Sequence, residues 1–131
     1  MITKTISIKT TEFNEIINIT NQIQKIVDES NIVDGQVILF VPHTTAAVTI
    51  NENTDPDLKK DILLGLSKFF PNLKEFEHFE NNSDAHIKAS LISPEQILLV
   101  ENKKLILGTW QGIYFCEFDG PRNRNLIVRI F

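Results

Sequence analysis

The alternation of hydrophobic and polar residues along this chain predicts strands more often than helices. At the N-terminus, Ile2, Ile6 and Ile8 alternate with threonine and serine, a pattern typical of a half-buried strand. The last third of the chain repeats such runs between short turn signals, so we predict an antiparallel meander there. The further strands that we predict lie over 15–19, 36–41, 43–51, 97–100, 105–107, 109–118 and 126–131.

Two longer segments have the spacing of amphipathic helices. Thr20 is placed to cap the first helix, which ends over 31–35. Asp55 followed by Pro56 is a strong start signal for the second helix, which Pro71 ends. A third, short helix is predicted around His86. The apolar faces are formed by Ile23, Ile26 and Val27 in the first helix and by Leu58, Ile62, Leu66 and Phe69 in the second.

Several predicted strands carry apolar residues on both of their faces, namely 37–41, 113–116 and 126–128. Two substantial helices cannot easily cover both faces of the sheet, so another subunit is expected to cover one of them. With 131 residues and no linker or repeat, the chain is predicted to be one α+β domain over 1–131.

Composition excludes several classes of protein. The net charge is −4, from 13 Lys+Arg against 17 Asp+Glu, and a nucleic-acid groove would show a basic excess. No apolar run approaches the roughly 20 residues that a membrane span needs, so no membrane partner is expected. The single cysteine, Cys116, cannot form an intrachain disulfide and fits a reducing compartment. We therefore expect a cytoplasmic protein.

All three histidines fall in two polar segments, 43–57 and 78–88. Imidazole is neutral near pH 7 and is a good nitrogen ligand, so this grouping indicates one polar site and a candidate metal site. By the period-two rule His43 shares its strand face with Thr45, Thr49 and Asn51. For each histidine, the alternative is an ordinary hydrogen-bonded or solvated side chain.

Other residues are candidates for acid–base chemistry or for ligand binding. Glu52 is the best placed carboxylate for proton transfer, although it equally suits stabilisation by the helix N-terminus at Asp55. Hydroxyl groups of Thr44, Thr45 and Ser90 are candidates for binding phosphate, although threonine is also common in strands for packing reasons. Thr109 and Gln111 flank Trp110 and are expected to line a pocket, and Arg122 with Arg124 suits an anion clamp or a solvated turn.

Three stretches resemble the YjbQ family, also called secondary thiamine-phosphate synthase. They are His43-Thr-Thr-Ala-Ala-Val-Thr-Ile-Asn-Glu-Asn53, Ala85-His-Ile-Lys88 and Leu107-Gly-Thr-Trp-Gln-Gly-Ile113. The resemblance implies a compact α+β fold, an antiparallel sheet or sandwich with helices packed on one side, and a homotrimer. It also implies a site built from the two histidine segments and an activity that joins a pyrimidine pyrophosphate to a thiazole phosphate.

This chain departs from the family's usual pattern at one point. The pattern has a Gly and a Met-Pro between the two histidines of the second segment, whereas here Asn81 and Asn82 stand near the Gly position and Asp84 runs directly into Ala85. The loop is also about three residues shorter. His43 and His86 carry over directly, and whether His78 reaches the same point stays open.

We therefore predict a metal-dependent enzyme that acts on small phosphorylated metabolites, with thiamine phosphate synthase as the specific activity. The alternatives are a metal-assisted hydrolase, a non-catalytic module that binds a phosphorylated metabolite, and a structural subunit without a small-molecule site. Zn²⁺ is the expected metal, and Mg²⁺ would enter only with the substrate. The predicted site comprises His43, Glu52 and His86 as catalytic residues, His43, His78 and His86 as metal ligands, and Thr44, Thr45, Asn51, Asn53, Lys88, Ser90, Thr109 and Gln111 as substrate-binding residues.

Overall fold

The computed structural model describes every residue from Met1 to Phe131 and contains eight strands and three helices. The helices are α1 (Thr20–Ser30), α2 (Pro56–Phe69) and α3 (Ser83–Ile92). The strands are β1 (Ile2–Lys9), β2 (Glu15–Asn18), β3 (Gly35–Phe40), β4 (Ala46–Glu52), β5 (Glu95–Glu101), β6 (Lys104–Leu105), β7 (Gln111–Glu117) and β8 (Asn123–Ile130).

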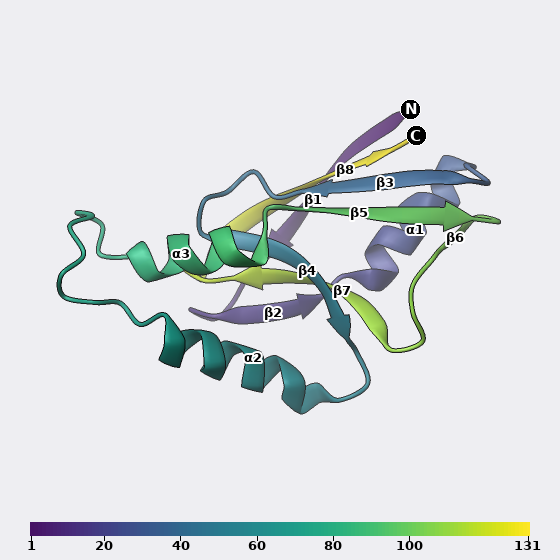
Figure 1. Cartoon of the computed structure of the whole chain (residues 1–131). Coiled ribbons are helices and arrows are strands. Elements are labelled where there is room, and N and C mark those ends of the chain that lie inside the picture. The colour runs from purple at the N-terminus through teal and green to yellow at the C-terminus, as the bar shows by residue number, and fades with distance from the viewer.

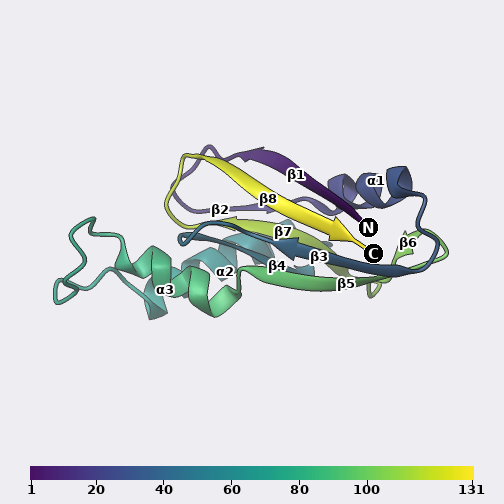
Figure 2. The same ribbon diagram turned by 90° about the horizontal axis from the view of Figure 1, so that it is seen from above.

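The strands form two antiparallel sheets that face each other. The larger sheet has the order β1-β8-β3-β5-β6, and the smaller has the order β2-β7-β4. Figures 1 and 2 show the two layers and also show that the chain termini lie close together at one end. This proximity follows from the register of β1 and β8, in which Ile2 lies opposite Ile130. The predicted antiparallel α+β fold is thus confirmed as a sandwich.

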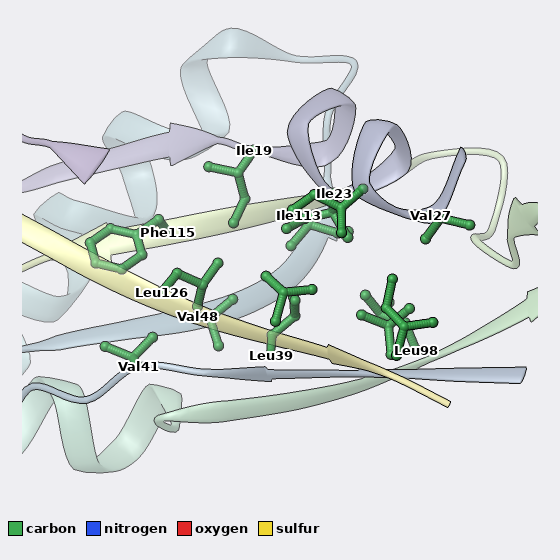
Figure 3. Close-up of a cluster of buried hydrophobic side chains, with 14 of the residues drawn as sticks. Ile19, Ile23, Val27, Leu39, Val41, Val48, Leu98, Ile113, Phe115 and Leu126 are labelled. Atoms are coloured by element: carbon green, nitrogen blue, oxygen red, sulfur yellow. The ribbon is translucent and has the colours of Figure 1, made fainter. Parts of the chain in front are cut away.

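The main hydrophobic core lies between the two sheets and is closed at one end by α1 (Figure 3). Ile23 and Val27 of α1 are fully buried, as the predicted apolar helix face requires. Phe115 at the centre of β7 is also fully buried. Because the inward residues of β3, β4, β7 and β8 meet here, this core fixes the distance between the sheets. The other large contributors are Ile19, Leu39, Val41, Val48, Leu98, Ile113, Leu126 and Ile130.

A second, smaller core joins α2 and α3 to the outer face of the smaller sheet. Ala85 and Ala89 of α3 pack there with Ala47 of β4 and Cys116 of β7. Burial raises the pKa of the Cys116 thiol to about 12, so the thiol is an inert packing group. The partly buried side chains of Ile62, Leu63 and Leu66 extend this core to α2.

The structure corrects the predicted meander. β5 and β8 belong to the larger sheet, whereas β7 lies between them in sequence but belongs to the smaller sheet. The turn at 119–121 therefore crosses from one sheet to the other instead of closing a hairpin. β7 is buried on both faces, because the second core covers its outer face, and this accounts for its two-faced apolar pattern. β8 alternates between buried and more exposed residues, so only its inner face lies in the sandwich interior.

Two local predictions have different outcomes. Asp55 caps α2 as predicted, because its carboxylate accepts a hydrogen bond from the Asp57 N–H at 2.9 Å. Thr20 does not cap α1; its hydroxyl instead accepts a hydrogen bond from the Ile113 N–H at 2.8 Å and so ties the helix start to β7. No helix combines the length and apolar character that are needed to cross a lipid bilayer.

Strand 36–41 was predicted to be covered on both faces, and within one chain this is wrong. Val37 and Leu39 of β3 point into the core, but Phe40 is 41% exposed on the outer face. On the neighbouring strand β5, Ile97 and Leu99 are also exposed. The chain thus leaves an apolar face on the larger sheet, which we call the outer apolar face: Ile38, Phe40, Ile97, Leu99 and Ile127.

Candidate functional site: a pocket of histidine and arginine side chains

All three histidines line one polar pocket of about 390 Å³. The pocket lies at the end of the sandwich where β3 and β7 end, where β4 and β8 begin, and where α3 and the α2–α3 loop project (Figure 1). Apart from Pro42, all of its lining residues have polar or charged side chains, and we call it the histidine–arginine pocket. The lining residues are Pro42, His43, Thr44, Thr45, His78, Glu80, Asn82, His86, Asp119, Arg122 and Arg124.

Each histidine reaches the pocket from a different element. His43 follows Pro42, which cannot continue the hydrogen bonding of β3 and so ends that strand. His86 projects from the first half of α3, and His78 lies on the loop between α2 and α3. The rings of His78 and His86 meet edge to face with their centroids 5.2 Å apart. The loop therefore brings His78 to His86.

His43 is held in the neutral form. Its Nε2 accepts a hydrogen bond from the Asn125 N–H at 2.9 Å, so the single ring proton is on Nδ1. Burial lowers the pKa of His43, and the nearby positive charge of Arg124 lowers it further. His43 consequently carries no positive charge near pH 7, and with this hydrogen bond in place neither of its nitrogens has a free lone pair.

The three imidazoles fit a metal ion in donor type. Nε2 of His86 is buried without a hydrogen-bond partner, as an unused ligand nitrogen would be. However, no group of three or more His, Cys, Asp or Glu side chains is gathered closely enough to hold a metal. His43 would also have to release Asn125 before it could bind one.

A buried ion pair forms the floor of the pocket. Arg124 donates hydrogen bonds through Nε and Nη2 to both carboxylate oxygens of Glu117 and through Nη2 to the Thr45 hydroxyl. Thr10 donates a further hydrogen bond to Glu117 at 2.7 Å, and the Asp119 N–H adds another. Burial by itself raises the pKa of Glu117, but these hydrogen bonds and the positive charge outweigh it, so the pKa lies below its ordinary value.

A second carboxylate, that of Asp119, joins two side chains that line the side of the pocket. Asp119 Oδ2 accepts hydrogen bonds at 2.9 Å from Arg122 Nη2 and from Asn82 Nδ2. Because a carboxylate only accepts hydrogen bonds, the amide of Asn82 must direct its nitrogen to Asp119. The opposite atom, Asn82 Oδ1, is buried and has no partner. Asn82 and His86, one helical turn apart at the start of α3, thus each hold one unused polar atom at this pocket.

The side chains of the pocket carry no excess positive charge. Arg122 and Arg124 bring two positive charges, Glu80 and Asp119 bring two negative ones, and Glu117 directly beneath adds a third negative charge. Since His43 is neutral, the chain by itself offers no excess positive charge to an anion. A ligand with a phosphate group would therefore need a bound cation or a protonated imidazole beside it.

Thr44, Thr45 and Ser90 were predicted to bind phosphate, and the structure gives them different surroundings. Thr44 and Thr45 line the histidine–arginine pocket, but the Thr45 hydroxyl is engaged by Arg124 at 2.8 Å. Ser90 lies outside this pocket, and its hydroxyl donates to the main-chain oxygen of His86. Lys88 is buried on the side of α3 that packs into the fold, where it pairs with Asp84 at 3.3 Å.

The remaining predicted residues lie at the opposite end of β4. This strand has seven residues and is about 20 Å long, so Glu52 at its end is far from His43 before its start. Glu52 lies opposite Gln111 in the sheet, and the Asn53 N–H donates to the main-chain oxygen of Trp110 at 2.7 Å. Within one chain the structure therefore does not bring this second group into the pocket: Asn51, Glu52, Asn53, Thr109 and Gln111.

Several residues of the pocket were not assigned to the site from the sequence. Asn82 and Glu80 were passed over although they adjoin the histidines, because nothing in their spacing indicates which way they point. Asp119 was not singled out either. Its spacing from Arg122, three residues later, is the one signal that could have suggested an ion pair.

Residues 4–131 match the family model described as "UPF0047 protein YjbQ-like". The UPF0047 protein YugU of Bacillus subtilis is 48% identical over 128 residues, covering 97% of both chains. The UPF0047 protein MJ1081 of Methanocaldococcus jannaschii is 50% identical over 123 residues, covering 94% of this chain and 89% of its own.

Solved structures agree with the sequence comparison. A YjbQ/UPF0047 protein from Clostridium acetobutylicum, described as uncharacterised, superimposes with a TM-score of 0.95 at 54% identity and covers 98% of this chain and 99% of its own. A protein of Sulfolobus solfataricus, described as YbjQ-like and of unknown function, gives a TM-score of 0.94 at 35% identity, covering 98% of this chain and 95% of its own.

Proposed function

This chain belongs to the UPF0047 YjbQ-like family, and we propose that its histidine–arginine pocket binds the phosphate group of a small phosphorylated metabolite. The observation that carries the proposal is the lining of the pocket: three imidazoles and two guanidinium groups, with Pro42 as the one apolar side chain. Arg124 uses Nε and Nη2 on the Glu117 carboxylate, whereas Arg122 uses Nη2 on the Asp119 carboxylate and Nε on the Asp119 main-chain oxygen. Neither guanidinium group makes a hydrogen bond through Nη1. Those free donors suit phosphate oxygens.

We further propose that a divalent metal, Zn²⁺ by donor type, completes the pocket with the phosphate. His43, His78 and His86 would hold it, and the unpartnered Nε2 of His86 supports this assignment. Bound there, the metal would neutralise phosphate charge and act as a Lewis acid. The lack of excess positive charge among the side chains is the reason for expecting a cation, and Mg²⁺ would enter only with the substrate.

Removing one imidazole should abolish metal binding and weaken phosphate binding. We expect protein purified without chelators to contain about one divalent metal per chain. A His86→Ala variant should lose the metal and bind inorganic phosphate at least about tenfold more weakly, which corresponds to about 1.4 kcal/mol. Elemental analysis and phosphate titration calorimetry measure the two effects. Lys60→Ala, which removes an exposed charge on α2, is the control and should change neither.

The parent protein and the His86→Ala variant also distinguish group transfer, hydrolysis and binding without turnover. Transfer would appear as thiamine phosphate formed from the pyrimidine pyrophosphate and the thiazole phosphate, and hydrolysis as release of inorganic phosphate. A binding module would do neither and would still bind phosphate. A metal-free parent whose phosphate affinity is unchanged by His86→Ala would contradict the proposal, and turnover that persists in this variant would indicate a contaminating enzyme.

We also propose that copies of this chain cover the outer apolar face, in a homotrimer. Three of its side chains support this: Ile97 is 62% exposed, Leu99 54% and Phe40 41%. Such a contiguous apolar surface on a sheet is typical of an interface between subunits.

Light scattering coupled to gel filtration tests the trimer. The parent is expected at three times the 15.0 kDa of the single chain. Ile97→Lys, which places a charge in the outer apolar face, should shift the protein toward single chains. Leu64→Lys makes the same change on α2, where the side chain is 55% exposed, and should leave the mass unchanged. A parent that runs as a single chain at micromolar concentration contradicts the assembly.

A further inference from the structure

A smaller hollow of about 240 Å³ adjoins the histidine–arginine pocket. Both spaces are lined by His43, Thr44 and His86, so these residues separate the two hollows and face both of them. The other residues of the smaller hollow are Ala46, Ala89, Ser90 and Pro94. The proposed function makes no use of this second space.

The two spaces differ in their chemistry. Every charged residue of the site lines the larger pocket only, and no charged residue lines the smaller hollow. Ala46, Ala89 and Pro94 give the smaller hollow apolar surface, while the Ser90 hydroxyl is already engaged at 2.8 Å with the His86 main-chain oxygen. The larger pocket therefore suits a charged group, and the smaller hollow suits an uncharged one.

The smaller hollow is built from fixed elements. Ala46 and Ala89 belong to the two hydrophobic cores and are 1% and 6% exposed. Main-chain hydrogen bonds hold the segment after α3 in place, because the Val41 N–H donates to the Pro94 oxygen at 2.7 Å and the Val48 N–H donates to the Ser93 oxygen at 3.1 Å. A hollow whose walls are held in this way can bind a group without first being ordered.

We infer that the ligand has two parts joined across His43 and His86, with its phosphate in the histidine–arginine pocket and a small uncharged organic group, of the size of one ring, in the smaller hollow. This inference rests on the proposed function and specifies the substrate class. It places the bond between the two parts beside both imidazoles. It also implies that the organic group adds affinity by burying apolar surface, which inorganic phosphate cannot do.

Two phosphonates test this directly because their carbon–phosphorus bond resists hydrolysis. Phenylphosphonate carries a ring, and methylphosphonate has the same charged head without it. We expect the parent to bind phenylphosphonate about tenfold more tightly than methylphosphonate, as measured by NMR titration. This comparison needs no substitution, so its result does not depend on the folding of a variant.

Filling the smaller hollow should remove the preference for the ring. Ser90 is exposed on α3, and Ser90→Leu places bulk in the hollow at a position where leucine favours the helix. In this variant phenylphosphonate should bind within about twofold of methylphosphonate. Ser83→Leu makes the same substitution on the same helix but lines neither space, and there the tenfold preference should persist.

The outcomes separate this inference from the proposed function. If the parent binds both phosphonates equally, or if Ser90→Leu keeps the preference for the ring, the two-part ligand is wrong while phosphate binding stands. If the parent binds neither phosphonate and no inorganic phosphate, the proposed function fails and the inference fails with it.

Discussion

Replacing Glu117 with alanine is expected to lower the free energy of unfolding by about 3–5 kcal/mol. Glu117 has no exposed side-chain surface, and the side chain of Arg124 is only 5% exposed. The substitution would leave the buried guanidinium without its counter-charge and would also deprive the Thr10 hydroxyl of its acceptor. Chemical denaturation at pH 7 measures the loss, at fixed protein concentration because assembly also contributes to stability.

The pH dependence of stability, compared between the parent and Glu117→Ala, gives a second measure of the ion pair. The folded-state pKa of Glu117 lies below its ordinary value of 4.5, which the group regains on unfolding. The contribution of Glu117 to the free energy of unfolding is therefore fully present above pH 4.5. It is lost as the pH falls below 4.5 and through the folded-state pKa. The difference between parent and variant should be constant above pH 5 and shrink in acid. Glu101→Ala, at an exposed position, is the control. If Glu117→Ala lowers the free energy of unfolding no more than Glu101→Ala does, the ion pair contributes little.

Phe115→Ala should cost about 3–5 kcal/mol, because it removes the largest fully buried side chain from the space between the sheets. The residue lies opposite Val48 on β4 and Ile17 on β2, so the resulting cavity touches all three strands of the smaller sheet. A total stability of about 5–15 kcal/mol is typical of a folded domain, so this loss would be a large fraction of the whole.

Thermal and chemical unfolding check this effect against a matched phenylalanine. Phe69 at the end of α2 is 82% exposed, and Phe69→Ala should change the stability by no more than about 0.5 kcal/mol. Equal losses for the two variants would show that the sandwich core is not packed as described.

Composition and pattern sufficed to predict most elements, but not their assignment to sheets. The short apolar runs of β7 and β8 predict strands, but such a run looks the same whether the next strand in sequence pairs with it or lies in the facing sheet. The sequence pattern also did not indicate the full extent of α3. Its buried face includes Asp84 and Lys88 beside Ala85 and Ala89, so charged residues interrupt the apolar pattern that marks an amphipathic helix.

The site was predicted only in part, because residues that are close in sequence need not be close in space. His43 and Glu52 were grouped because they belong to the same polar segment, but an extended chain carries neighbours in sequence far apart in space. Grouping by segment worked for His78 and His86, where a loop and a helix start fold back on each other. Asn82 and Asp119 meet across 37 residues of sequence, and no local pattern encodes such a contact.

The pairing of β1 with β8 leaves both chain ends beside each other, at the end of the sandwich remote from the histidines (Figures 1 and 2). An affinity tag or a surface anchor attached at either end would therefore leave the mouth of the pocket open to diffusing small molecules. A short peptide bridge could also join Phe131 to Met1, with new ends opened in the largely exposed loop over 70–81. Such a rearranged chain would keep His43 and His86 on their scaffold while releasing His78 from one of its two covalent tethers.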